Sequence, residues 1–142
     1  MVFSSDSNSY IHVVRLNKGE RWSEAFAEFT TSTKVNGAWV TIIGGVLEVT
    51  LGYYDLEKKQ YEWQTFQGLR EITGIQGNIA LNEQGEPMAH LHGSFSDENY
   101  QMIGGHVKDF VAAATVEVFV QRFSQSLHRK TDPDVGLQTL SI

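Results

Sequence analysis

The spacing of apolar residues changes between two periods along the chain. Residues 11–16 predict a first strand, and the apolar positions after Gly19 recur every three or four residues, as on a helix. From Ala38 the period becomes two, which predicts a strand that runs to about Tyr53. The helical positions are Trp22, Ala25, Phe26 and Phe29.

The rest of the chain up to residue 123 is predicted to be strand interrupted by polar loops. The sequences DLEKKQ at 55–60 and NEQGEP at 82–87 are typical of turns. Short spacings between strands favour antiparallel pairing over crossover connections. We therefore predict an α+β fold, in which one principal helix packs against a curved, mainly antiparallel sheet. The predicted strands are 61–66, 70–80, 88–96, 100–106 and 112–123, with 108–111 as a short connector.

The composition fits one globular domain. The 142 residues are 41% hydrophobic and 20% charged, which is the balance of an ordinary folded chain. We predict a single domain over residues 1–142, with its core at about 11–123 and a C-terminal tail at 124–142. Because there is no cysteine, any metal must be held by His, Asp or Glu. No stretch approaches the roughly 18 apolar residues of a membrane span, so we expect a cytoplasmic protein without a membrane partner.

Basic residues are few and scattered. The formal net charge is −6, and no basic run is longer than the pairs at 58–59 and 129–130. Binding to the phosphates of a nucleic acid requires a concentrated basic surface. We therefore do not expect direct DNA binding by the isolated domain, although folding could gather scattered cations into a patch.

Three of the five histidines carry the strongest chemical signal. His90 and His92 are separated by one residue, so their side chains share one face of a strand. The polar segment SDEN at 96–99 predicts a hairpin. If that hairpin is centred on Glu98, His106 lies directly opposite His90. A register shifted by one residue places Gly105 there instead, and a bulge or strand twist must then return His106 to the cluster.

The chemistry of three converging imidazoles suits a metal. Neutral imidazoles bind zinc and other borderline divalent cations, and three protein ligands leave a coordination position for water or a small molecule. We predict an open site for a divalent metal, with zinc as the first candidate, at His90, His92 and His106. The alternative is that these histidines are merely hydrogen-bonded or exposed. His12 and His128 have no such companions, and we expect them to be surface or packing residues.

The glycines that precede His106 also bear on this site. Gly104 and Gly105 predict a bulge or a close backbone approach within the strand. A bulge at this point would change the direction of the His106 ring. No strand, GxGxxG and helix series surrounds the pair, so the glycines do not indicate a phosphate-binding loop.

Two glutamates, Glu117 and Glu71, are candidate acid or base groups. Glu117 lies in the segment AAATVEVFV, both faces of which are apolar enough to be largely buried. A buried carboxylate needs a donor, a cation or a proton, so a structural ion pair with an arginine is the alternative to a role at the metal. Glu71 follows Arg70 in a predicted strand, so only one of these two side chains can face the site.

The tail carries apolar residues in an unusual density for a chain end. Asp132 and Pro133 predict a turn followed by extended chain. The segment from Val135 onward contains no lysine or arginine. We expect it to pack over a sheet edge or to reach a neighbouring subunit.

The segment HLHGSFSDENYQMIGGHVKDFVAAATVEVFV at 90–120 resembles the signature of plant-and-prokaryote-conserved (PPC) domain proteins. In that family a histidine pair leads through an acidic turn to Gly-Gly-His and a closing Thr-x-Glu-Val strand. Three earlier segments are similar to the family's opening strand and helix, its central hairpin and its next strand: RLNKGERWSEAF at 15–26, GGVLEVTLGYYDLEKKQYEW at 44–63 and REITGIQGNIAL at 70–81. The resemblance covers about residues 11–123.

The resemblance implies an assembly and a function that the residues alone do not. It implies a homotrimer of the stand-alone prokaryotic type, of the family's DNA-binding or regulatory class, with metal at His90, His92 and His106 and a small ligand at the metal. Plant members carry AT-hook arms that grip DNA, and this sequence has no such Arg-Gly-Arg segment. The fold also resembles that of acetolactate decarboxylase, whose zinc is held by three histidines. The alternative is therefore a metal-dependent lyase or hydrolase acting on a small carboxylate or carbonyl compound.

Overall fold

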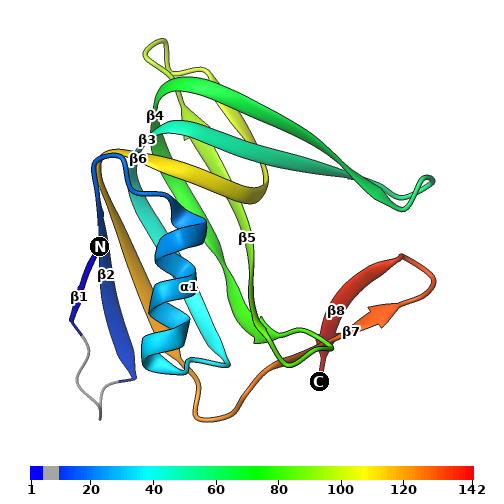
Figure 1. Cartoon of the computed structure of the whole chain (residues 1–142). Helices are drawn as coiled ribbons and strands as arrows, with labels where there is room; N and C mark the ends of the chain where they lie inside the picture. Colours follow the sequence, from blue (N-terminus) through cyan, green and yellow to red (C-terminus); the bar gives the residue numbers. More distant parts are fainter. Residues whose placement is uncertain (5–9) are drawn as a thin grey trace.

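The structure is a computed structural model that describes residues 1–4 and 10–142, and it consists of a strongly bent sheet with one helix (Figure 1). The predicted curved, mainly antiparallel sheet with a packed helix is confirmed, but strands dominate so clearly that α+β is an approximate description. The elements are β1 (Val2–Ser4), β2 (Ile11–Asn17), α1 (Trp22–Thr33), β3 (Ala38–Asp55), β4 (Gln60–Leu81), β5 (Pro87–Ser96), β6 (Met102–Arg122), β7 (His128–Asp132) and β8 (Leu137–Ser141).

The strands follow the order β1-β2-β6-β3-β4-β7-β8, and β5 pairs with both β4 and β6. Strands β3, β4, β5 and β6 therefore close into a ring, because β3 also pairs with β4 and β6. All these pairings are antiparallel, and β7 joins β4 through a single parallel bridge. The closed ring holds β5 and the beginning of β6 side by side, which is where the predicted histidines lie.

Two strands are longer than the sequence predicted. The segments 61–66 and 70–80 belong to one strand, β4, and the segments 100–106 and 112–123 belong largely to one strand, β6, with no separate connector at 108–111. Bulges absorb the irregular positions without ending the pairing. At one of them Leu47 lies opposite two residues of β4, and Gly68 there adopts a positive φ of 98°. The strands bend at such points instead of stopping.

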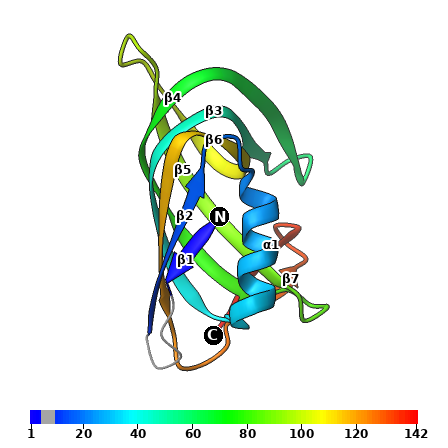
Figure 2. The ribbon, with the colours of Figure 1, turned by 60° about the vertical axis from the view of Figure 1, so that its left-hand side comes forward.

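Helix α1 lies against one face of β2, β6 and β3 (Figure 2). Its apolar face is buried, and Trp22 stacks on Phe110 of β6 with ring centroids 5.6 Å apart. The side chain of Asp109 accepts hydrogen bonds from the backbone and hydroxyl of Ser23, which supplies the first turn with an acceptor. The helix ends where Lys34 adopts a left-handed conformation with φ of 54°.

The other face of β2, β6 and β3 has no covering element in the described part of the chain (Figure 2). The sequence predicted that both faces of residues 112–120 are largely buried, and the structure corrects this. Val116, Val118 and Val120 are buried beneath α1, whereas Phe119 is 42% exposed on the opposite side. Helix α1, the one helix among the described residues, lacks the length and hydrophobicity that crossing a membrane requires.

Candidate metal centre

The histidines come together at the β5–β6 hairpin, in a register that differs from both predicted ones. His92, not His90, lies directly opposite His106. The Asp97 side chain accepts hydrogen bonds from the backbones of Asn99 and Gln101, so the turn is centred one residue later than the sequence suggested. Directly opposed residues share a face, and His90 is the next residue on that face of β5. The cluster therefore forms without a bulge between β5 and β6.

The three imidazoles converge on the outer face of this strand pair. One nitrogen from each of His90, His92 and His106 lies within 4.8 Å of the other two. The ring centroids are 5.1 to 5.3 Å apart, and the Nε2 atoms of His90 and His92 are separated by 3.2 Å. Leu91, between the two β5 histidines, is buried in the core, which fixes the histidines on the opposite side.

The glycine pair before His106 allows close backbone packing instead of a bulge. The β5–β6 register is regular through Gly104 and Gly105. A side-chain carbon at Gly104 would lie 2.8 Å from the carbonyl oxygen of Gly93, and one at Gly105 would lie 2.9 Å from that of Gly52. The irregularity in β6 comes after His106, where Lys108 is left out of the β3 register.

Two aromatic rings of β4 form one wall beside His106. Tyr61 and Trp63 stack with centroids 4.6 Å apart, and the Tyr61 ring lies 4.8 Å from that of His106. The Tyr61 hydroxyl is 3.4 Å from Nδ1 of His106. Gly52 pairs with both Trp63 and His106, and an added side-chain carbon there would lie 2.5 Å from the Trp63 ring. Glycine at this position therefore makes room for the aromatic wall.

Arg129 of β7 forms the other wall. Its side chain is buried, with 5% exposed, and its Nη2 atom lies 3.1 Å from Nδ1 of His90. The same Nη2 donates to the Asn78 side chain, and Nη1 donates to the Gln138 carbonyl oxygen of β8. The hairpin of β7 and β8 thus carries an arginine onto the histidine cluster. In Figure 1 the β7–β8 hairpin and the tip of the β3–β4 hairpin both lie on the right-hand side of the view.

The electrostatic environment keeps two of the histidines neutral. Burial lowers the pKa of His90 to about 4, with smaller contributions from the charges of Arg129 and His92. Burial likewise lowers the pKa of His106 to about 4, with smaller contributions from the charges of His90, His92 and Arg129. Both rings are therefore neutral at pH 7, and the neutral imidazole is the form that binds a metal.

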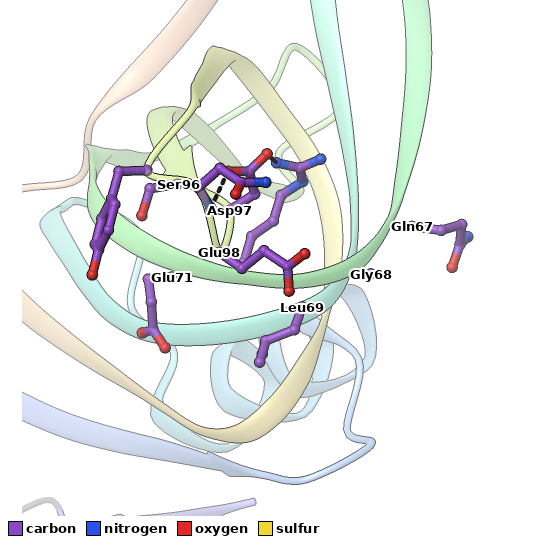
Figure 3. A pocket seen from close by; sticks show the side chains of 10 residues that line it. Gln67, Gly68, Leu69, Glu71, Ser96, Asp97 and Glu98 are labelled. Atoms are coloured by element: carbon purple, nitrogen blue, oxygen red, sulfur yellow. Dashed lines mark hydrogen bonds and ion pairs between the residues drawn. The ribbon is translucent and has the colours of Figure 1, made fainter.

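The candidate glutamates lie elsewhere. Glu71 is exposed and lines a separate hollow at the β5–β6 turn, together with Asp97 and Glu98 (Figure 3). Glu117 is half-buried on β6, at the position opposite Arg15 in the backbone register with β2. Neither glutamate lines the hollow that contains His90 and His106. Of the other histidines, His12 is buried against Phe29 and His128 is exposed.

Sequence reasoning missed Arg129, Tyr61 and Trp63. Arg129 belongs to a basic pair with Lys130, and such a pair is typical of an exposed surface. Only the alternation of β7 shows that Arg129 faces inward while Lys130 is exposed. The spacing of Tyr61 and Trp63 places them on one face, but only the pairing of Gly52 with His106 shows that this face meets the histidines. The contact of these residues with the histidines depends on pairing between strands that are distant in the sequence.

Comparison with known proteins identifies the family. The model of the Plants and Prokaryotes Conserved (PCC) domain matches residues 3–124, so the chain belongs to this family, the one that its signature segment resembles. No match was found among curated proteins.

Solved structures share the fold over nearly the whole chain. A metal-containing protein from Archaeoglobus fulgidus is 26% identical, with a TM-score of 0.86, and the alignment covers 100% of this chain and 99% of that one. A protein from Ralstonia eutropha JMP134 described as a "Putative DNA-binding protein" is also 26% identical, with a TM-score of 0.84 and coverage of 92% and 90%.

The likeness to acetolactate decarboxylase is confirmed at the level of the fold. The enzyme from Bacillus subtilis subspecies spizizenii is 19% identical, with a TM-score of 0.54. The alignment covers 78% of this chain but 52% of the enzyme. This chain therefore matches about half of that protein.

Proposed function

We propose that this chain is a metal-binding PCC-domain protein in which His90, His92 and His106 hold a divalent cation, with zinc as the first candidate, and leave an open position for a small ligand. The observation that carries the proposal is the convergence of three imidazole nitrogens on one outer face of β5 and β6. The donor set fits the ion, because imidazole suits zinc and the two half-buried rings of His90 and His106 are already neutral. Such an ion would act as a Lewis acid toward a bound oxygen.

Two further observations support a metal at this place. The Archaeoglobus fulgidus relative is described as metal-containing. Tyr61 lies beside Nδ1 of His106, where a hydrogen-bonding group outside the ligand set can fix the orientation of the ring. The enzyme alternative has less support, because neither Glu71 nor Glu117 lines the histidine hollow.

The test is elemental analysis of the purified protein and of two matched variants. His92→Ala should lose stoichiometric metal and keep its fold, because open sites contribute less to folding than closed structural zinc sites. His128→Ala, which removes an exposed histidine outside the cluster, should keep its metal. Full metal occupancy in His92→Ala would overturn the assignment. Circular dichroism checks that each variant is folded.

We further propose that the protein assembles as a homotrimer in the cytoplasm. The outer face of β2, β6 and β3 supports self-association, because it exposes Val13, Trp39, Ile43 and Phe119 to between 39% and 47%. Phe119 pairs in register with Val13 on one side and with Thr41 on the other, and Trp39 and Ile43 are the neighbours of Thr41 on the same face of β3. An uncovered face that exposes large apolar side chains on three adjacent strands is typical of a subunit interface.

For the biological role we propose regulation through the metal-site ligand rather than direct contact with duplex DNA. The Ralstonia eutropha relative is described as DNA-binding. This chain carries a formal charge of −6, which a homotrimer multiplies by three. Repulsion from a phosphate backbone would oppose binding by the domain alone.

A further inference from the structure

The hollow beside the histidines has an unusual charge balance. It measures about 640 Å³ and lies between the β4–β5 surface and the β7–β8 hairpin. We call it the Arg129 hollow. His90, His106 and Arg129 are among its polar lining residues, together with Tyr61, Asn78, Gln138 and Thr139, and Trp63 and Leu137 belong to its apolar lining. Among the described residues that line it there is no aspartate or glutamate.

Arg129 is a buried cation without a counter-ion. The residue is 95% buried, yet no carboxylate in the described part of the chain lies within ion-pair distance of its side chain. Its partners are the neutral groups of Asn78, Gln138 and His90, and its buried Nε–H has no hydrogen-bond partner among the described residues. Burying a charge costs much free energy unless an opposite charge compensates it. A bound anion would therefore compensate the buried charge of Arg129.

A divalent cation at the histidines would add further positive charge and so make a bound anion more favourable. A cation bound through Nε2 of His90 leaves the proton of this ring on Nδ1, so Nδ1 can no longer accept from Arg129. Arg129 and His90 would then both offer donors to an acceptor in the hollow. The hollow at the β5–β6 turn provides the contrast. It contains Glu71, Asp97 and Glu98, and its arginine, Arg70, already lies 3.7 Å from Asp97 (Figure 3).

We propose that the Arg129 hollow binds a small monocarboxylate with an apolar body, an inference that rests on the proposed metal site and defines the ligand class of that site. The Arg129 guanidinium pairs with the carboxylate, for which its planar donor geometry is suited. The apolar body lies against the side chains of Trp63, Met88 and Leu137. Arg129 is the one formally charged side chain among the described residues of the lining, which favours a monocarboxylate over a highly charged phosphate ester.

The experiment compares benzoate with benzamide, which has nearly the same shape but no charge. Zinc-loaded protein is titrated with each compound by isothermal calorimetry in a buffer free of carboxylates. Benzoate should bind at least about tenfold more tightly, as a charge-assisted hydrogen bond in a buried site predicts. Equal affinity for the two compounds, or no binding of benzoate to zinc-loaded protein, would overturn the inference. This comparison requires no variant.

Two variants test whether Arg129 is the anion-binding group. Arg129→Gln should lose at least about tenfold of the benzoate affinity while still binding zinc. Lys130→Gln removes the same charge from the next, exposed position of β7 and should bind benzoate like the wild type. Arg129→Lys, which keeps the charge without the planar fork, should recover part of the affinity and replaces Arg129→Gln if that variant is unfolded. Unchanged benzoate affinity in the folded Arg129 variant would contradict the inference.

The two proposals fail in distinguishable ways. Zinc binding without any preference for benzoate refutes the ligand class and leaves the metal site intact. Absence of zinc binding to the wild type refutes the proposed function. In that case the same two titrations of metal-free protein decide whether Arg129 alone selects the carboxylate.

Discussion

His12 is a buried histidine whose ring nitrogens have no hydrogen-bond partner in the described part of the chain. Burial lowers its pKa, and the charge of Arg122 lowers it further. The unfolded chain therefore binds more protons than the folded one once the pH falls below about 6.5, the ordinary value for histidine. Acidification through this range destabilises the fold, and the effect levels off below the folded-state pKa.

Replacement of His12 by leucine should remove this source of acid sensitivity. At pH 7 the variant should be more stable by about 1 kcal/mol, because an unpaired buried polar ring is lost. Its advantage over the wild type should grow as the pH is lowered from 6.5. Urea unfolding at a series of pH values measures both effects, with His128→Leu as the exposed control. An advantage that shrinks on acidification would show that His12 is not neutral in the fold.

Gly52 provides a second test at the residue scale. Gly52→Ala should push the rings of Trp63 and Tyr61 away from His106, because its new carbon would overlap the Trp63 ring. Loss of such supporting contacts should weaken zinc affinity by about tenfold. Gly74→Ala is the matched control, since nothing lies within 4 Å of the corresponding carbon. Competition with a chromogenic chelator measures the affinity, and equal values for both variants would contradict a supporting role for the aromatic wall.

The identities of the clustered histidines could be predicted from sequence, whereas their pairing could not. Strand alternation alone places His90 and His92 on one face. The register depended on the backbone of the turn, where Tyr100 adopts a positive φ of 61° although it is not glycine. Such a conformation is rare for a tyrosine, so the sequence gives little indication of it.

At the scale of elements, the chain from Val135 onward is held both to β3 and to its hairpin partner β7. The Tyr54 hydroxyl of β3 donates to the Val135 carbonyl oxygen, and Arg129 of β7 donates to that of Gln138. Deletion from Val135 onward removes both acceptors and should lower Tm by about 5 °C. Removal of Ile142 alone, which is fully exposed, should leave Tm unchanged. Differential scanning calorimetry and light scattering measure the result, and an unaffected Tm and mass after the longer deletion would show that the hairpin is dispensable.

The elements predicted most accurately are those with one uninterrupted period. The strand predicted at 11–16, which is β2, the start of the helix and the turns at 55–60 and 82–87 agree with the structure, whereas β1 was not predicted. The expected breaks in β4 and β6 were wrong, because a bulge keeps a strand paired while its side chains lose their alternation. The tail was expected to be extended and packed, but β7 was not foreseen, since HRKTD has no apolar face.

At the scale of the whole molecule, we predict that the protein associates into a homotrimer. The wild type should have a mass in solution of about three times 15.9 kDa. Phe119→Glu places a charge in the middle of the exposed apolar face and should yield the single-chain mass. Tyr53→Glu changes an aromatic residue that is 74% exposed outside this face and should leave the assembly intact. Multi-angle light scattering makes the measurement. A monomeric wild type would refute the proposed trimer.

The charge of the whole molecule predicts weak contact with DNA. The purified protein should bind a random duplex with a dissociation constant above about 1 μM at physiological salt, because no basic footprint compensates the net charge of −6. Fluorescence anisotropy of a labelled duplex measures this over a range of salt concentrations. Tight binding that weakens steeply with added salt would show that folding or assembly concentrates the scattered cations.

The metal ligands and Arg129 come from different parts of the chain, so they can change independently among relatives. All three histidines lie within one short hairpin inside the segment that defines the family, whereas Arg129 comes from a hairpin beyond residue 124. A change in the terminal hairpin can therefore exchange one preferred small molecule for another without disturbing the ion. We expect relatives that keep the same ion to differ in the compound they recognise, and the residue aligned with Arg129 to be the first place where that difference is visible.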